Sequence, residues 1–131
     1  MFSCQIDPAR RRIIVEALLH GPHGFVEAYL LVDTGTPVTV VDGEVIHDLG
    51  YTARDGIGRS RLVGPDDDAA SQGWVIAIAA LEAFGARHEP YQVHVHDMPR
   101  DDGIDGLLGM DWLIRHVTML DGPGGVLAMV R

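Results

Sequence analysis

The chain has 131 residues, which is enough for one hydrophobic core and short for two, so we expect a single domain over residues 1–131. Its 10 basic and 19 acidic side chains give a net charge of −9, and phosphate backbones and anionic membranes are bound by clustered basic side chains, so neither nucleic acid nor a membrane is expected as a partner. A single cysteine, Cys4, with no secretory signal pattern and no apolar run of about 18 residues, leads us to expect a cytoplasmic protein.

Glycine and proline punctuate the chain every few residues, a pattern typical of short strands joined by turns. The stretches whose β-branched and aliphatic residues predict strands are 10–19, 25–32, 37–41, 74–81, 90–96, 117–120 and 126–130. The first two flank a turn-like segment, so they are expected to form a hairpin.

Two short helices are predicted between these strands. Asp42 can cap the first, which would run to Leu49 and be closed by the glycine after it. The second covers residues 110–116, where Asp111 and Arg115 are spaced to pair across one turn. So many strands with so little helix predict a mostly-β fold, a small closed or folded-over barrel rather than alternating strand–helix–strand units.

One acid directly follows an apolar strand, in the run Leu-Leu-Val-Asp-Thr-Gly-Thr over residues 30–36. A carboxylate in that position costs free energy unless it has partners, and the glycine lets another backbone approach closely. The tripeptide Asp33-Thr34-Gly35 alone is also compatible with an Asp that only accepts N–H bonds from its own turn.

A second motif lies downstream, where Leu107-Leu108-Gly109 leads into the second predicted helix. With both motifs in view, the chain resembles the retropepsin-like aspartic proteases over residues 13–129. That family has an apolar strand ending in Asp-Thr/Ser-Gly, then a short helix, a β-hairpin flap and a late apolar-apolar-Gly that opens a helix. The same parts occur here in the same order, with the flap within residues 59–74, and the run Leu-Leu-Gly-Met-Asp-x-Leu is similar to bacterial members.

The resemblance implies a barrel-shaped aspartic endopeptidase that acts on peptide or protein substrates as a homodimer, with no metal or organic cofactor. Peptide hydrolysis at such a site needs one ionised carboxylate to activate water and one protonated carboxyl to polarise the scissile carbonyl. Because the chain has one Asp-Thr-Gly, two copies related by a two-fold axis would place Asp33 beside its symmetry mate.

The resemblance also assigns supporting roles to the residues around Asp33. Thr34 would hydrogen-bond across the dimer, and Gly35 would bring its backbone against the carboxylates. The hydroxyl of Thr36 could bond the outer oxygen of Asp33, which would favour the ionised carboxylate. The next residue, Pro37, departs from the family pattern, which commonly has a small polar residue there.

The tip of the flap would include Gly64, Pro65, Asp66, Asp67 and Asp68. This acidic tip also departs from the neutral, glycine-rich tips of the family, and the segment can equally be a solvated loop. As a flap tip it would favour basic peptides over acidic ones.

Other residues suggest competing sites. His94 and His96, with Asp97 beside them, suggest a metal site, but no further ligand stands at a recognisable spacing, so no metal is expected. Cys4 has no obvious base near it in sequence, and both tryptophans, Trp74 and Trp112, lie in apolar runs typical of a core.

Two further functional classes remain compatible with the sequence. One is a retropepsin-like domain that dimerises or binds peptides without cleaving them, since a fold does not guarantee activity. The other is an all-β ligand-binding module in which Asp33 only caps a turn.

Overall fold

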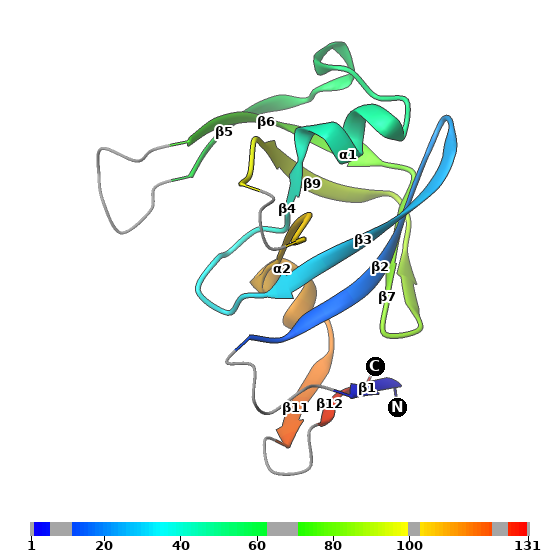
Figure 1. Cartoon of the computed structure of the whole chain (residues 1–131), viewed down its shortest axis with the longest axis vertical. Helices are drawn as coiled ribbons and strands as arrows, with labels where there is room; N and C mark the ends of the chain where they lie inside the picture. Colours follow the sequence, from blue (N-terminus) through cyan, green and yellow to red (C-terminus); the bar gives the residue numbers. More distant parts are fainter. Residues whose placement is uncertain (1, 6–11, 63–70, 100–102, 122–125, 131) are drawn as a thin grey trace.

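The computed structural model describes residues 2–5, 12–62, 71–99, 103–121 and 126–130 (Figure 1). The strands are β1 (Phe2–Gln5), β2 (Ile14–Gly21), β3 (Gly24–Val32), β4 (Val40–Asp42), β5 (Gly58–Leu62), β6 (Ser71–Ile78), β7 (Ala80–Ala83), β8 (Ala86–His88), β9 (Tyr91–His96), β10 (Gly106–Leu108), β11 (Val117–Asp121) and β12 (Val126–Val130). Between them lie the helices α1 (Gly43–Asp48) and α2 (Met110–Leu113) and a single 3₁₀ turn, η1 (Ala53–Asp55). Neither helix of this part of the chain is long and apolar enough to cross a lipid bilayer.

The strands form two sheets. The larger has the order β5-β6-β9-β4-β10-β3-β2-β7-β8, and the smaller has the order β1-β12-β11 and lies at the lower end of the molecule in Figure 1. The predicted mostly-β fold with two short helices is confirmed, but the predicted closure of a barrel is wrong for the described residues. The larger sheet ends in β5 and β8, which do not pair, although β2 and β6 are in contact with four strands between them in sheet order. The sheet therefore folds over on itself and stays open.

The hairpin predicted near the N-terminus is formed by β2 and β3, in register from Ile14 opposite Leu31 to Gly21 opposite Gly24. Gly24 has φ of +109°, a left-handed conformation that favours glycine at the turn. In β2, buried and more exposed side chains alternate, with Val15, Ala17 and Leu19 buried. This alternation is expected of a sheet with one face against the core.

The first predicted helix is confirmed as α1. Asp42 is its N-cap, since its carboxylate accepts a hydrogen bond from the N–H of Glu44 at 3.1 Å. Gly50 follows the helix with φ of +96°, as predicted. The second predicted helix is shorter than expected, because α2 ends at Leu113.

The core is made of aliphatic side chains from both halves of the folded sheet, closed by α1 and α2. Its largest fully buried side chain is Trp112 of α2, which confirms the core position predicted for that tryptophan. Leu108 of β10 and Leu30 of β3 are also fully buried, so the two strands that carry the sequence motifs are fixed by the core itself.

Candidate functional site

The two sequence motifs meet where β3 and β10 end. The strands are parallel, with Leu107 opposite Leu31 and Leu108 opposite Val32, so the residues that follow them leave the sheet side by side. The N–H of Asp33 donates to the carbonyl oxygen of Leu108 at 2.9 Å. Residues more than 70 positions apart in sequence are therefore hydrogen-bonded neighbours in the fold.

Asp33 is half-buried at the end of β3. One of its carboxylate oxygens, Oδ1, accepts a hydrogen bond from the N–H of Gly35 at 2.8 Å, while Thr34 and Gly35 are exposed. A Cβ atom on Gly35 would lie 3.1 Å from that same oxygen, so the glycine gives the carboxylate room to face its own turn. An acid held in this way at the open end of a strand is accessible to water and to a bound molecule.

Thr36 makes a different hydrogen bond from the one expected. Its hydroxyl donates to the carbonyl oxygen of Val38 at 3.4 Å. A hydroxyl has one proton to donate, so this bond leaves none for the carboxylate of Asp33. The bond expected between Thr36 and Asp33 is therefore not made in this structure, and the N–H of Gly35 serves that carboxylate instead.

Two glycines, Gly109 at the end of the second motif and Gly106 directly before it, are needed for close backbone contact. A Cβ atom on Gly109 would lie 2.3 Å from the carbonyl oxygen of Val38, and one on Gly106 would lie 2.1 Å from the carbonyl oxygen of Val40. No side chain fits at these distances. The second motif can lie directly against the loop that carries Asp33 because Gly109 has no side chain to keep the two backbones apart.

Asp111 is a member of the site that the sequence did not reveal as such. The predicted pair with Arg115 is replaced by other contacts: the carboxylate of Asp111 accepts hydrogen bonds from the hydroxyls of Thr39 and Tyr91, both at 2.8 Å. The guanidinium of Arg115 lies over the ring of Tyr91, 5.3 Å from its centroid. Burial raises the pKa of the Tyr91 hydroxyl above its usual range, so this hydroxyl remains a donor. The sequence carried one signal, an acid in the first turn of the helix that opens at Gly109.

The predicted flap region contains an antiparallel hairpin, β5–β6, with Gly58 opposite Val75 and Leu62 opposite Ser71. The residues proposed for its tip, Gly64, Pro65, Asp66, Asp67 and Asp68, lie outside the described residues.

Two histidines of β9 are within hydrogen-bonding distance of one serine of β5. The Oγ atom of Ser60 lies 2.6 Å from Nδ1 of His94 and 2.7 Å from Nε2 of His96. Ser60 is opposite Gly73, whose missing side chain leaves room for the ring of His96. Burial lowers the pKa of both histidines, so their neutral forms are favoured. The two histidines considered for a metal site are thus engaged in hydrogen bonds to Ser60 between β9 and β5, whereas Asp97 lines a separate pocket.

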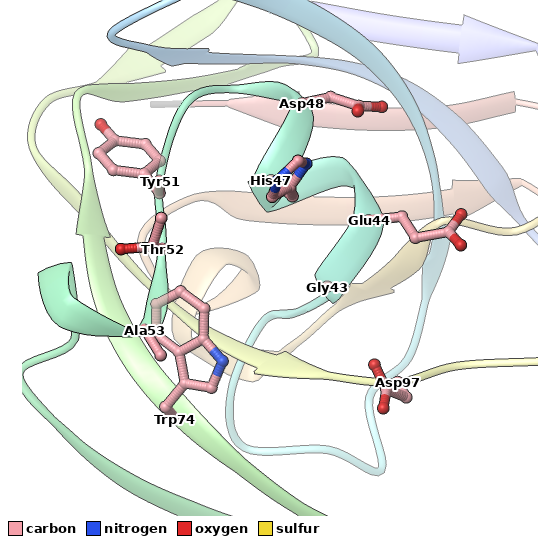
Figure 2. Close-up of a pocket in the computed structure, with 9 residues that line it drawn as sticks. All are labelled: Gly43, Glu44, His47, Asp48, Tyr51, Thr52, Ala53, Trp74 and Asp97. Carbon is pink, nitrogen blue, oxygen red and sulfur yellow. The ribbon is translucent and has the colours of Figure 1, made fainter.

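A pocket of about 490 Å³ lies elsewhere, between α1, η1 and the start of β6 (Figure 2). Its lining residues are Gly43, Glu44, His47, Asp48, Tyr51, Thr52, Ala53, Trp74 and Asp97. None of them belongs to the loop of Asp33. Trp74, predicted as a core residue, is only partly buried and forms one wall of this pocket.

The fold and the site together define the class of protein. A strand ending in Asp-Thr-Gly, held beside a parallel strand ending in Leu-Leu-Gly within a folded β-sheet, is the arrangement of the retropepsin-like fold. The chain belongs to the aspartyl protease family, whose model matches residues 15–112.

Solved structures with the same fold come from bacteria, viruses and protozoa. A retropepsin-like aspartic protease from Rickettsia conorii has a TM-score of 0.68 at 18% identity, over 97% of this chain and 87% of that one. EIAV protease, in complex with an inhibitor, has a TM-score of 0.61 at 19% identity, over 81% and 88%. The retroviral protease-like domain of Ddi1 from Leishmania major has a TM-score of 0.61 at 20% identity, over 90% and 87%. No curated protein sequence matches the chain significantly.

Proposed function

We propose that this protein is an aspartic endopeptidase whose active site is completed by two copies of Asp33, one from each chain of a homodimer. The observation that carries the proposal is the hydrogen bond from Asp33 to Leu108, which joins the Asp-Thr-Gly turn to the second motif. Membership in the aspartyl protease family and the fold shared with viral and bacterial proteases support it.

The chemistry requires both carboxyls. Two carboxyls about 3 Å apart cannot both ionise readily, so the pair keeps one proton over a range of pH on the acid side of neutrality. The ionised carboxylate takes a proton from water as the water attacks the scissile carbonyl, and the protonated carboxyl donates a hydrogen bond to the carbonyl oxygen. The N–H of Gly35, at 2.8 Å from Oδ1, fixes the orientation of the Asp33 carboxylate within its turn.

The proposal extends to partner, substrate and setting. One domain supplies one Asp33, so the second comes from a symmetry mate, and the exposed Thr34 can reach across to it. The substrate is a peptide or protein bound between Asp33 and the β5–β6 hairpin, and the hydrolysis needs no metal or organic cofactor. The negative chain would act in the cytoplasm and would favour basic peptides.

The decisive test is Asp33→Asn. This change keeps the size of the side chain but removes the shared proton, so turnover of a peptide library should fall to background while the dimer survives. Asp48→Asn, at an exposed helix position, is the matched control and should keep wild-type activity. Cleavage by Asp33→Asn at an appreciable rate would rule out the aspartic mechanism.

The pH profile gives a second test of the same proposal. Activity of the wild type should follow a bell on the acid side of neutrality, and its two apparent pKa values should belong to the Asp33 pair as a unit. A wild-type protein that cleaves nothing between mildly acidic and neutral pH would favour a non-catalytic dimer or peptide-binding domain.

A further inference from the structure

The loop that carries Asp33 rests on the first turn of α2. The N–H of Met110 donates to the carbonyl oxygen of Thr36 at 2.9 Å, and the N–H of Asp111 donates to that of Pro37 at 3.1 Å. The first N–H groups of a helix have no partners within it, and here the loop supplies those partners. The position of the loop therefore depends on the position of α2.

A chain of side-chain hydrogen bonds reinforces this contact. The N–H of Gly109 donates to Oγ1 of Thr39 at 3.2 Å, and that hydroxyl donates its own proton to Oδ1 of Asp111 at 2.8 Å. The other oxygen of Asp111 accepts from the hydroxyl of Tyr91 at 2.8 Å. Thr39 is fully buried and Tyr91 almost so, so these bonds are shielded from water.

The direction of each bond follows from the carboxylate. An ionised carboxylate only accepts, so Thr39 must turn its proton toward Asp111, and its lone pair then faces the N–H of Gly109. Gly109 follows Leu108, whose carbonyl oxygen holds the N–H of Asp33 at 2.9 Å. The chain of contacts runs without a gap from Asp111 to Asp33.

We propose that Asp111 is a positioning residue, which fixes the Asp33 loop against the second motif by orienting the hydroxyl of Thr39 and anchoring it to Tyr91 of β9. This role rests on the proposed function, because it serves the reaction at Asp33. The carboxylate of Asp111 binds Thr39 and Tyr91, so it acts through other residues. It holds the loop where the carboxyl of Asp33 can meet its symmetry mate.

The test compares three variants around Asp111 with one matched control. Thr39→Val has the shape of threonine without the hydroxyl, Thr39→Ser restores the hydroxyl, and Tyr91→Phe removes one donor to Asp111. Tyr51→Phe is the control, because it likewise removes a tyrosine hydroxyl that makes one hydrogen bond, here accepted from the N–H of Ala79 at 2.9 Å and not part of the contacts of Asp111. Should Thr39→Val fail to fold, Tyr91→Phe carries the test.

The kinetic readout is the split between kcat and KM on a peptide substrate. Thr39→Val and Tyr91→Phe should lower kcat by about 10- to 100-fold with KM little changed, because a misplaced catalytic group slows the chemical step. Thr39→Ser should recover most of the loss, and Tyr51→Phe should keep the wild-type kcat. Wild-type kcat in both Thr39→Val and Tyr91→Phe would overturn the proposal.

A second readout separates this proposal from the proposed function. In the Asp33→Asn background, amide hydrogen exchange at Gly35 and Gly109 should become at least about tenfold faster in Thr39→Val and in Tyr91→Phe, while exchange at Leu19 in the core stays the same. Equal acceleration at all three amides would indicate general destabilisation and would overturn the positioning role. A wild type that cleaves nothing removes the proposed function, and this exchange pattern then decides alone whether Asp111 fixes the loop.

Discussion

Gly109 shows how a single missing side chain sets the geometry of the site. A Cβ atom there would come within 2.3 Å of the carbonyl oxygen of Val38, which belongs to backbone and cannot swing away. We therefore expect Gly109→Ala to lower the free energy of unfolding by about 1–3 kcal/mol and to reduce activity. Gly58→Ala is the control, because nothing lies within 4 Å of its added methyl, and its change should stay within about 0.5 kcal/mol. Urea unfolding at one fixed protein concentration measures both, and equal stability of the two variants would contradict the steric argument.

At this scale the sequence predicted residues whose role is written in their local pattern. Asp33 and Gly109 were found because each follows an apolar run and precedes a turn or helix. The partners of Thr36 and Asp111 were predicted incorrectly. Their hydrogen bonds depend on which carbonyls and hydroxyls the folded sheet brings near, and spacing along the chain does not specify that.

The β5–β6 hairpin pairs with β9 through the backbone of β6. The side chains of Ser60, His94 and His96 add a second link, between β5 and β9. Ser60 has one hydroxyl proton, so at most one histidine can accept from it, and the other must donate. Burial is the main cause that lowers both pKa values; His94 lowers that of His96 further, while Asp111 and Asp97 oppose the shifts at His94 and His96 respectively.

Because folding lowers the pKa of His94 and His96, the free energy of unfolding depends on pH with a definite sign. Below about pH 6.5 the unfolded chain binds protons that the buried rings resist, so the free energy of unfolding is highest above that pH and falls as the pH drops below it. His96→Gln, whose amide does not titrate, should weaken this pH dependence, whereas His47→Gln at an exposed position should leave it as in the wild type. Urea midpoints at about pH 7.5 and about pH 5.5, one on each side of the ordinary histidine pKa, provide the comparison. A wild-type midpoint that does not fall on acidification would refute the expectation.

Elements with a clear local pattern were predicted well, and some short strands without one were missed. The two aliphatic stretches on either side of a turn-like segment predicted the hairpin of β2 and β3, and the capping acid predicted α1. The strand β10 has only three residues and is held by pairing with β3 on one side and β4 on the other. Such pairing is a long-range property, which is also why the open edges of the sheet could not be foreseen.

In the molecule as a whole, some apolar side chains remain exposed in or just before the smaller sheet, which is made of β1, β12 and β11. Ile114, just after α2, is 73% exposed, and Leu120 of β11 is 61% exposed. Exposed apolar groups that lie close together commonly mark an interface between proteins. Ile114 lies directly beyond the helix whose first turn holds the Asp33 loop, so a partner that covers it would approach the proposed active site.

The proposed dimer therefore predicts that a charge at this surface reduces both association and activity. Ile114→Glu and Leu120→Glu should each raise the dimer dissociation constant at least about tenfold, because the carboxylate would lose its hydration on burial without gaining a partner. Ile57→Glu is the matched control, since Ile57 is 62% exposed but precedes β5, which belongs to the larger sheet. Sedimentation equilibrium over micromolar concentrations measures association.

Activity per chain at low concentration should fall for the Ile114→Glu and Leu120→Glu variants and recover as concentration rises, because the proposed active site needs two chains. A wild-type protein that stays monomeric and keeps full activity on dilution would show that Asp33 acts without its symmetry mate, and the two-chain active site would have to be abandoned.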